Sequence, residues 1–185
     1  ESCKKISYLF PRAHAVAYVM MAFRIAWFKV YHPLAFYAAY FSIRAKAFDL
    51  RIMTGDLKTQ MTEFNRIKAL DRGASPKDKD LMSALEVSME MYQRGYRFVN
   101  VDIQHSEARR FSIKDGALLP PFLAIDSLGA TVADAIVAER EERPFTSLKD
   151  LQRRCKVSNT IIDLMKELKC CGELPEDEQM SLFGA

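Results

Sequence analysis

The stretch that decides the fold is AIDSLGATVADAIVAER, which covers residues 124–140. It contains the apolar residues Ile125 and Leu128, and Gly129 follows directly in a turn. Three further apolar residues recur at the spacing of a helix, namely Ala133, Ile136 and Val137. A glycine turn in front of a helix exposes backbone N–H groups at the positive end of the helix dipole, where an anion is stabilised. The stretch therefore predicts a turn and a helix start that bind an anion.

The order and spacing of these residues resemble the helix-hairpin-helix motif, apolar-x-Gly-apolar-Gly-x-x-x-Ala-x-x-apolar-apolar, with Gly129 as its second glycine. Ser127 departs from the pattern, because it occupies the position of the first glycine. A turn of this kind faces a DNA phosphate and reads no base edge, so its binding is independent of sequence. The DNA contacts that we predict for this first turn are Ser127, Gly129, Ala130 and Thr131. An ordinary pair of helices joined by a glycine cap is the alternative.

A weaker second copy of the motif follows. PFTSLKDLQRRC, residues 144–155, predicts a capped helix, and KVSNTIIDLMKEL, residues 156–168, predicts a turn at Ser158-Asn159 followed by a helix. Paired hairpins hold both strands of a duplex, and each neutralised phosphate steepens the salt dependence of binding by about one log–log unit. The DNA contacts that we predict for this second turn are Arg154, Lys156, Ser158, Asn159 and Thr160. A solvated basic face is the alternative.

The composition is that of a soluble globular protein. The 185 residues are enough for one or two domains with a buried core, and 49% hydrophobic and 28% charged residues fit this class. The net charge of +3 does not by itself indicate a nucleic-acid partner, so any basic surface must come from local clustering. The four cysteines form neither a CxxC pair nor a disulfide framework, which indicates reduced thiols. The first residue is Glu1, so we expect a piece of a longer chain.

The remaining sequence predicts a mainly α fold. Pro11 suits the start of a helix over about 12–31, and His32-Pro33 breaks this helix, because the residue before a proline avoids the helical region. A second apolar helix continues to about residue 47. Two amphipathic helices then form a helical hairpin, the first over about 56–70.

The second helix of this hairpin has a clear start signal, with Ser75 as N-cap, Pro76 at the first helical position and Asp78 at the third. After it, apolar and polar residues alternate, and Asp115-Gly116 is a strong hairpin-turn signal. We therefore expect a small β element of two or three strands between residues 96 and 122.

The apolar stretch over 13–47 resembles a membrane span at first sight. Charged residues, a histidine and a proline interrupt it: Arg24, Lys29, His32 and Pro33. No uncharged run reaches the ~18–20 residues that a bilayer requires. We therefore predict a helix surrounded by protein or facing an anion, and no membrane partner.

Four segments together resemble a known family. FPRAHAVAYVMMAFRIAWFKVYHP precedes the helical hairpin, DSLGATVADAIVAER and PFTSLKDL follow it, and QMSLF stands near the end of the chain. In this order they resemble the C-terminal end of the PolC-type bacterial replicative DNA polymerases, the alpha subunit of DNA polymerase III in the C family. The resemblance covers essentially the whole chain.

The resemblance implies three parts. Residues 1–47 would be the C-terminal part of the polymerase fingers, residues 48–172 a duplex-DNA-binding domain with a helical hairpin, a small β element and tandem helix-hairpin-helix turns, and residues 173–185 a flexible tail. In the fingers, Arg12 and His14 would stand near the triphosphate of the incoming nucleotide and stabilise its charge. A capping or packed histidine is the alternative for His14.

The resemblance also implies a partner for the tail, because replicative polymerases insert such a peptide into the sliding clamp. The peptide consists of Gln179, Met180, Ser181, Leu182 and Phe183. Each large side chain buried in an apolar cleft would supply ~1.5–3 kcal/mol, less the cost of ordering the peptide. The implied partners are thus primer–template duplex DNA, the sliding clamp and the rest of the polymerase chain.

The carboxylates of a polymerase palm are missing from the sequence. Polymerases hold paired Mg²⁺ ions with two or three carboxylates, whereas Asp102, Asp115 and Asp126 are scattered around turns. We therefore expect a cytoplasmic enzyme fragment that is inactive alone and holds no cofactor, while the parent polymerase uses Mg²⁺ and deoxynucleoside triphosphates. Two alternatives stay open: a stand-alone helix-hairpin-helix adaptor between DNA and the clamp, and a purely structural helical domain.

Overall fold

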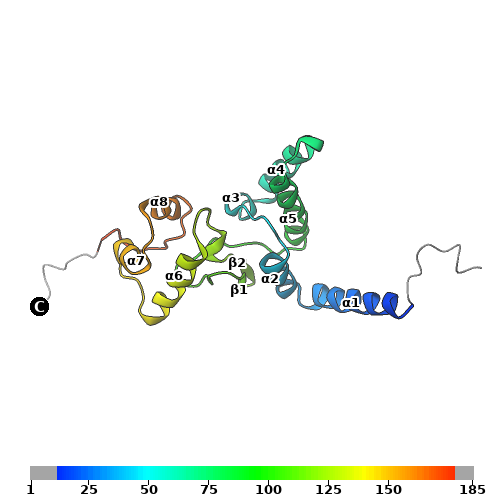
Figure 1. Cartoon of the computed structure of the whole chain (residues 1–185), viewed down its shortest axis with the longest axis horizontal. Coiled ribbons are helices and arrows are strands. Elements are labelled where there is room, and N and C mark those ends of the chain that lie inside the picture. The colour runs from blue at the N-terminus through cyan, green and yellow to red at the C-terminus, as the bar shows by residue number, and fades with distance from the viewer. Residues whose placement is uncertain (1–11, 178–185) are drawn as a thin grey trace, which may run out of the picture.

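The computed structural model describes residues 12–177, and in this part of the chain the fold is mainly helical, as the sequence predicts. The helices are α1 (Arg12–Tyr31), α2 (Pro33–Ile43), α3 (Leu50–Met53), α4 (Leu57–Ala69), α5 (Pro76–Gln93), α6 (Ala130–Glu142), α7 (Leu148–Cys155) and α8 (Asn159–Glu167). Figure 1 shows α2–α5 grouped at one side and α6–α8 at the other, with a small sheet between the two groups.

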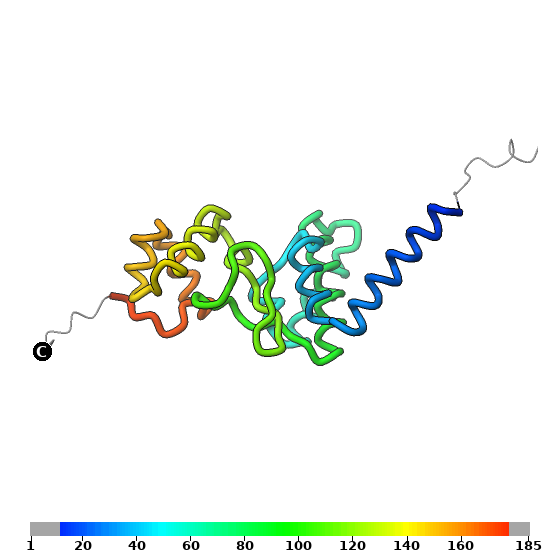
Figure 2. The backbone as a smooth tube through the Cα atoms, turned by 90° about the horizontal axis from the view of Figure 1, so that it is seen from below, coloured from blue at the N-terminus to red at the C-terminus, as the bar shows by residue number. Residues whose placement is uncertain are grey.

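Helix α1 extends away from the rest of the chain (Figure 2). It ends at Tyr31, where His32-Pro33 starts α2, as predicted. None of its residues is buried, and large apolar side chains are exposed on opposite sides of the helix, such as Phe23 and Ile25, which lie about 200° apart around its axis. By length and composition α1 is able to cross a membrane, so the expected absence of a membrane partner stays a prediction. A helix that is apolar all round is normally surrounded by protein or lipid.

The helical hairpin of α4 and α5 forms where the sequence predicts it. The hydroxyl of Ser75 accepts a hydrogen bond from the Asp78 amide at 3.1 Å, and the Asp78 carboxylate accepts one from the Ser75 amide at 3.1 Å. This capping box, with Pro76 at the first helical position, starts α5. Gly95 follows the end of α5 with a φ of +86°, a conformation that favours glycine. The four-residue helix α3 has no counterpart among the predicted elements.

The β element is a single hairpin of β1 (Ser112–Lys114) and β2 (Ala117–Leu119). Asp115 and Gly116 both have positive φ, 50° and 75°, as a two-residue type I′ turn requires. The stretch FVNVDI does not form the third strand that the alternation allows. It contributes the isolated bridge between Phe98 and Leu118 of β2.

Apolar side chains gather in two clusters. The N-terminal core joins Tyr37 and Phe41 of α2 to Ile67, Leu85 and Met91 of α4 and α5. The expected boundary at residue 47 separates α2 from these partners, although α2 packs with them in one core. The reason is that the aromatic face of α2 needs the α4–α5 hairpin to cover it.

The C-terminal core lies under the two predicted DNA-binding turns. Its largest fully buried side chains include Phe122, Ile125 and Ile136, and it continues into Leu151 of α7 and Met165 of α8. Phe48 packs against both cores and connects them. Residues 48–172, expected as one domain, therefore contribute to two cores.

Candidate nucleic-acid interface

The first turn leads from Ile125 into α6. Ile125 and Leu128 are buried in the C-terminal core, and the Leu128 amide donates to the Ile125 carbonyl at 3.2 Å. Between them, Ser127 is exposed and has a φ of +64°. Gly129 is the N-cap of α6, with φ −71° and ψ 153°. The two apolar anchors therefore hold an exposed, left-handed residue directly in front of a helix N-terminus.

The second turn repeats this geometry between α7 and α8. Lys156 is exposed and has a φ of +54°, Val157 is buried, and Ser158 is the N-cap of α8 with φ −71° and ψ 156°. The Ser158 hydroxyl accepts a hydrogen bond from the Ile161 amide at 3.4 Å. The weaker copy that the sequence suggests therefore has the backbone of the first turn.

Comparison of the two turns explains how the chain departs from the glycine positions of the helix-hairpin-helix motif. Ser127 and Lys156 occupy the position of the first motif glycine, and both retain the left-handed conformation that glycine adopts without strain. A non-glycine residue pays about 1–2 kcal/mol for it. Leu128 and Val157 anchor the turns, and Gly129 and Ser158 are the caps. The departure at Ser127 therefore leaves the conformation of the turn intact.

The backbone of Gly129 is unstrained, and the space around its α-carbon is open. Its φ of −71° suits any residue, and a β-carbon at this position would meet no atom of residues 12–177 within 4 Å. The fold of the described chain therefore does not require a glycine here. What glycine provides is open access to the amides of the first turn of α6, where Ala130 is half-buried and Thr131 exposed.

The second turn presents a more polar surface. Asn159 and Thr160 are exposed at the start of α8, beside Lys156. The side-chain carbonyl of Asn159 accepts a hydrogen bond from the Gln152 amide group at 2.6 Å, which ties α8 to α7. Four of the five residues predicted here, all but Arg154, are thus exposed around one turn.

The environment of Arg154 does not match the expectation that this residue contacts DNA. Its side chain is 11% exposed, and its guanidinium lies between Glu139 and Asp150, with the ring of Phe145 at 4.8 Å. Nε donates to Glu139 at 2.9 Å and Nη1 to the Arg143 carbonyl at 3.0 Å. Two carboxylates therefore hold the positive charge of Arg154 inside the protein. The sequence does not reveal this, because it does not show which residues pack around Arg154.

The structure does not bring the predicted nucleotide-contacting residues near the two turns. Arg12 and His14 are exposed at the N-terminal end of α1, which lies at the opposite end of the molecule from α6–α8 (Figure 1). The imidazole of His14 packs edge-on against Tyr18, with ring centroids 4.5 Å apart. Arg12 and His14 thus form a separate candidate site.

The predicted clamp-binding peptide, residues 179–183, lies outside the described residues. The beginning of the expected tail is described, and it packs against the protein. The carbonyls of Pro175 and Glu176 accept hydrogen bonds from the amides of Leu148 and Lys149 at the start of α7. Leu174 packs against the C-terminal core. The chain is therefore attached to α7 as far as these residues.

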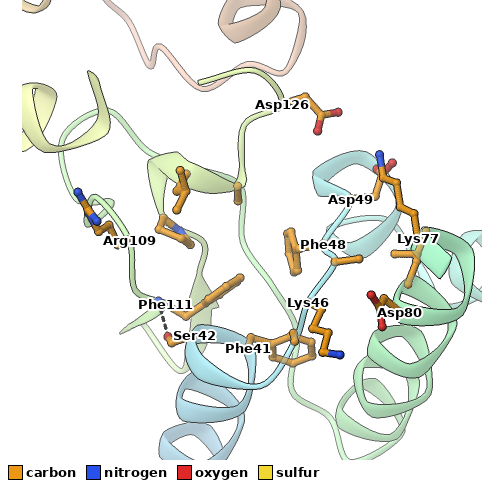
Figure 3. A pocket seen from close by; sticks show the side chains of 16 residues that line it. Phe41, Ser42, Lys46, Phe48, Asp49, Lys77, Asp80, Arg109, Phe111 and Asp126 are labelled. Atoms are coloured by element: carbon orange, nitrogen blue, oxygen red, sulfur yellow. Dashed lines mark hydrogen bonds between the residues drawn. The ribbon is translucent and has the colours of Figure 1, made fainter. Parts of the chain in front are cut away.

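A groove that sequence analysis missed opens beside the first turn (Figure 3). Phe41, Phe48 and Phe111 line its apolar part, and the Phe111 amide donates to Ser42 at 2.9 Å. Its charged lining residues are Lys46, Lys77 and Arg109 against Asp49, Asp80 and Asp126. Because the two signs balance, the groove does not favour a polyanion over other ligands. No single motif marks it, since its residues come from distant segments.

Comparisons with known proteins agree with this geometry. A family model described as the helix-hairpin-helix motif matches residues 95–179, which include both turns. Curated proteins named DNA polymerase III PolC-type match almost the whole chain. One from Caldanaerobacter subterraneus subsp. tengcongensis is 48% identical over 99% of this chain, and one from Streptococcus suis is 49% identical over 99%.

The chain spans 13% of the length of these curated relatives. A further relative of the same name, from Streptococcus pyogenes serotype M12, is 47% identical over 99% of this chain. The match therefore includes α1 as well as the two turns. Over nearly its entire length, this chain belongs to the family of PolC-type DNA polymerase III proteins, of which it forms a helix-hairpin-helix segment.

Proposed function

We propose that this segment holds duplex DNA for a replicative DNA polymerase by binding backbone phosphates at its two turns. The observation that carries the proposal is the shared backbone of the turns, in which an exposed left-handed residue precedes a capped helix start. Each helix start directs amide N–H groups to solvent, which is a general site for phosphate. The names of the relatives support a DNA ligand, and the match through α1 favours a polymerase segment over a stand-alone adaptor.

The chemistry of the turns predicts how binding depends on conditions. Backbone amides, short hydroxyls and one lysine contact phosphates without reading bases, so the affinity should not depend on sequence. Each phosphate contact releases condensed counterions, and the logarithm of the binding constant falls with the logarithm of the salt concentration by about 0.9 per contact. Binding that is equal at low and high salt would contradict this proposal.

Lys156→Asn tests the contact at the second turn. Asparagine tolerates the left-handed conformation that Lys156 adopts, so the substitution removes the charge with little strain. We expect duplex binding to weaken and its log–log salt slope to become shallower by about one. The measurement is fluorescence anisotropy of a labelled duplex over a series of salt concentrations.

Lys169→Asn is the matched control. Lys169 is also exposed and has a positive φ of 55°, but it follows α8 rather than preceding it. Its replacement removes the same charge from the same backbone conformation and should leave the salt slope unchanged. Equal slopes for both variants and the parent would argue against a phosphate contact at Lys156.

We further propose that α1 belongs to the nucleotide-binding side of the polymerase, with Arg12 and His14 near the triphosphate. Protein from the rest of the polymerase chain would then cover the apolar surface of α1. Its exposure on all sides supports this, because such a surface is stable only when it is covered. The α1 helix is held at its C-terminal end, where Lys29 pairs with Glu90 at 2.7 Å and Arg94 donates to the Lys29 carbonyl at 2.8 Å.

We therefore expect the full chain to self-associate through α1 and the chain without residues 1–31 to be a monomer. The remaining helices keep both cores, so far-ultraviolet circular dichroism should change only by the loss of α1 itself. Light scattering during size-exclusion chromatography measures the change. Phe23→Lys, at a side chain that is 73% exposed, should reduce association in the full chain. Retention of the full chain on lipid vesicles, lost in the truncated form, would instead favour a lipid surface for α1.

The remaining parts of the proposal concern the whole polymerase. We propose that residues 179–183 bind the sliding clamp, that the parent enzyme acts in the cytoplasm, and that Mg²⁺ and deoxynucleoside triphosphates are bound by its other parts. Within residues 12–177 no group of three histidine, cysteine or acidic residues is arranged to hold a metal ion. We propose that this segment alone does not polymerise DNA.

A further inference from the structure

We propose that Arg154 is a positioning residue that sets the spacing of the two phosphate-binding turns. The proposal rests on the proposed DNA-binding function, and its direct test does not require DNA. Arg154 lies on α7, two residues before Lys156 of the second turn. Its side chain reaches the far end of α6, the helix that starts at the first turn. One side chain thus connects the elements that carry the two turns.

The contacts of Arg154 fix α6 from several directions. Nε donates to the Glu139 carboxylate at 2.9 Å, and Nη2 donates to the Glu139 backbone carbonyl. Nη1 donates to the carbonyl of Arg143, just after α6, at 3.0 Å, and to Asp150 of α7 at 3.3 Å. A planar guanidinium makes such diverging hydrogen bonds in one fixed geometry, which an ammonium group does not reproduce.

Helix α6 transmits this restraint to the first turn. About nine residues separate Glu139 from the start of α6, and a helix of that length is a rigid rod of roughly 14 Å. If the end at Glu139 is held against α7, the orientation of the end at Gly129 is fixed as well. The Arg143–Ser147 connection between α6 and α7 has no helix or strand, so Arg154 supplies a restraint that the backbone alone does not.

Fixed spacing matters because two linked sites bind one ligand more tightly than either alone. The second contact forms at a high effective concentration when the first has formed, and the gain is lost when the geometry is not maintained. Loss of Arg154 should therefore weaken duplex binding without removing a phosphate contact. A direct phosphate contact predicts the opposite, a shallower salt slope.

The direct test measures the distance between the turns in the full chain without DNA. Nitroxide labels on Thr131→Cys and Thr160→Cys, both exposed positions, report the distance by pulsed electron paramagnetic resonance. A Cys3→Ser background is used. Burial raises the pKa of Cys155 to about 11 and that of Cys170 to about 12 and also raises the pKa of Cys171, so these thiols stay protonated and react slowly near pH 7.

We expect Arg154→Met to broaden the distance distribution and Arg153→Met to leave it unchanged. Arg153 is the matched control because it is the adjacent residue, carries the same charge, is 68% exposed and donates to the same carboxylate, that of Asp150, at 2.8 Å. Arg154→Lys and Glu139→Gln are milder variants and should broaden the distribution partially. They keep the test valid if Arg154→Met does not fold, as circular dichroism would show. Unchanged distributions in these folded variants would overturn the proposal.

The DNA measurement separates this proposal from the proposed function. Arg154→Met should weaken duplex binding on the order of tenfold, because part of the gain from two linked contacts is lost, while the salt slope of the parent is retained. A slope shallower by about one would assign Arg154 to a phosphate and overturn the positioning role. If the parent itself shows no salt-dependent duplex binding, the proposed function fails, and the distance distributions alone decide the role of Arg154.

Discussion

Replacement of Asp150 by asparagine should lower the free energy of unfolding by about 3–5 kcal/mol, the usual cost of removing one partner from a buried ion pair. The Asp150 side chain is fully buried, and its carboxylate accepts hydrogen bonds from Arg153 at 2.8 Å and Arg154 at 3.3 Å. The Thr146 amide donates a further bond at 3.3 Å. Asparagine would leave Arg154 with one carboxylate partner inside the protein, so the loss exceeds that of a surface pair.

Asp134→Asn provides the matched control for this prediction. Asp134 also pairs with an arginine, Arg109, but both side chains are about half exposed. Exposed pairs of this kind contribute about 0–1 kcal/mol. Urea denaturation followed by circular dichroism measures both variants. If the two substitutions lower the free energy of unfolding equally, the buried network around Asp150 stabilises the fold no more than an exposed ion pair does.

The contribution of the Asp150 carboxylate should also appear in the pH dependence of the free energy of unfolding. Burial tends to raise the pKa of Asp150, but hydrogen bonds from Arg153, the Thr146 amide and Arg154 outweigh it and place the pKa below the ordinary 3.8. A carboxyl group with a lower pKa in the folded state stabilises the fold above the ordinary pKa, and this contribution is lost as the pH falls through the folded value.

The pH range in which acid destabilises the fold is set by the carboxylates that have a lowered pKa in the folded state. For Asp102, burial acts upward, but the bonds from Lys114, the Gln104 amide and His105 lower the pKa to about 2. Stability should therefore decrease as the pH falls from about 4 towards 2, starting at the ordinary carboxyl pKa. In Asp150→Asn this decrease should be smaller, because one of the titrating groups is missing.

The elements that could be predicted from the sequence are those that a few adjacent residues determine. The proline at residue 33 ends α1, the Ser75 capping box starts α5, and Asp115-Gly116 closes the β hairpin. Each signal acts through local backbone sterics or a hydrogen bond between near neighbours. The second turn was also predictable, because the apolar anchor, the cap and the helix follow one another within a few residues.

The features that could not be predicted depend on packing between distant segments. Arg154 lies beside Lys156 in a basic run, yet Glu139, fifteen residues earlier, determines where its charge goes. Likewise, Tyr37 belongs to the core of α4 and α5 rather than to a separate N-terminal part, because only the folded hairpin covers its ring. Sequence spacing reports which residues share a helix face, but not which helix packs against that face.

The described part of the C-terminal segment changes how a clamp-binding tail would work. Glu176 pairs with Lys166 at 2.6 Å, and Asp177 pairs with Lys149, so the chain is attached to α7 and α8 up to two residues before Gln179. A clamp bound at residues 179–183 would then lie close to α6–α8, the helices that carry both turns. DNA and clamp contacts made by one chain reinforce each other.

Deletion of residues 179–183 should therefore weaken binding to a clamp loaded on duplex DNA by about 10²–10⁴-fold, leaving the affinity of the turns for DNA alone unchanged. Surface plasmon resonance with immobilised duplex, with and without the loaded clamp, separates the two terms. Leu182→Ala with Phe183→Ala should reproduce the loss, because the proposed clamp pocket buries these two side chains.

Glu176→Gln with Asp177→Asn is the control with the same number of substitutions. It removes exposed ion pairs next to the peptide, each of which contributes about 0–1 kcal/mol, and leaves the apolar side chains in place. Clamp binding should persist in this variant. Equal binding by the parent and the deletion would show that the tail is not the clamp ligand. Loss in the control and the deletion alike would show that clamp binding requires the attachment of the tail to α7 and α8 as well as its apolar peptide.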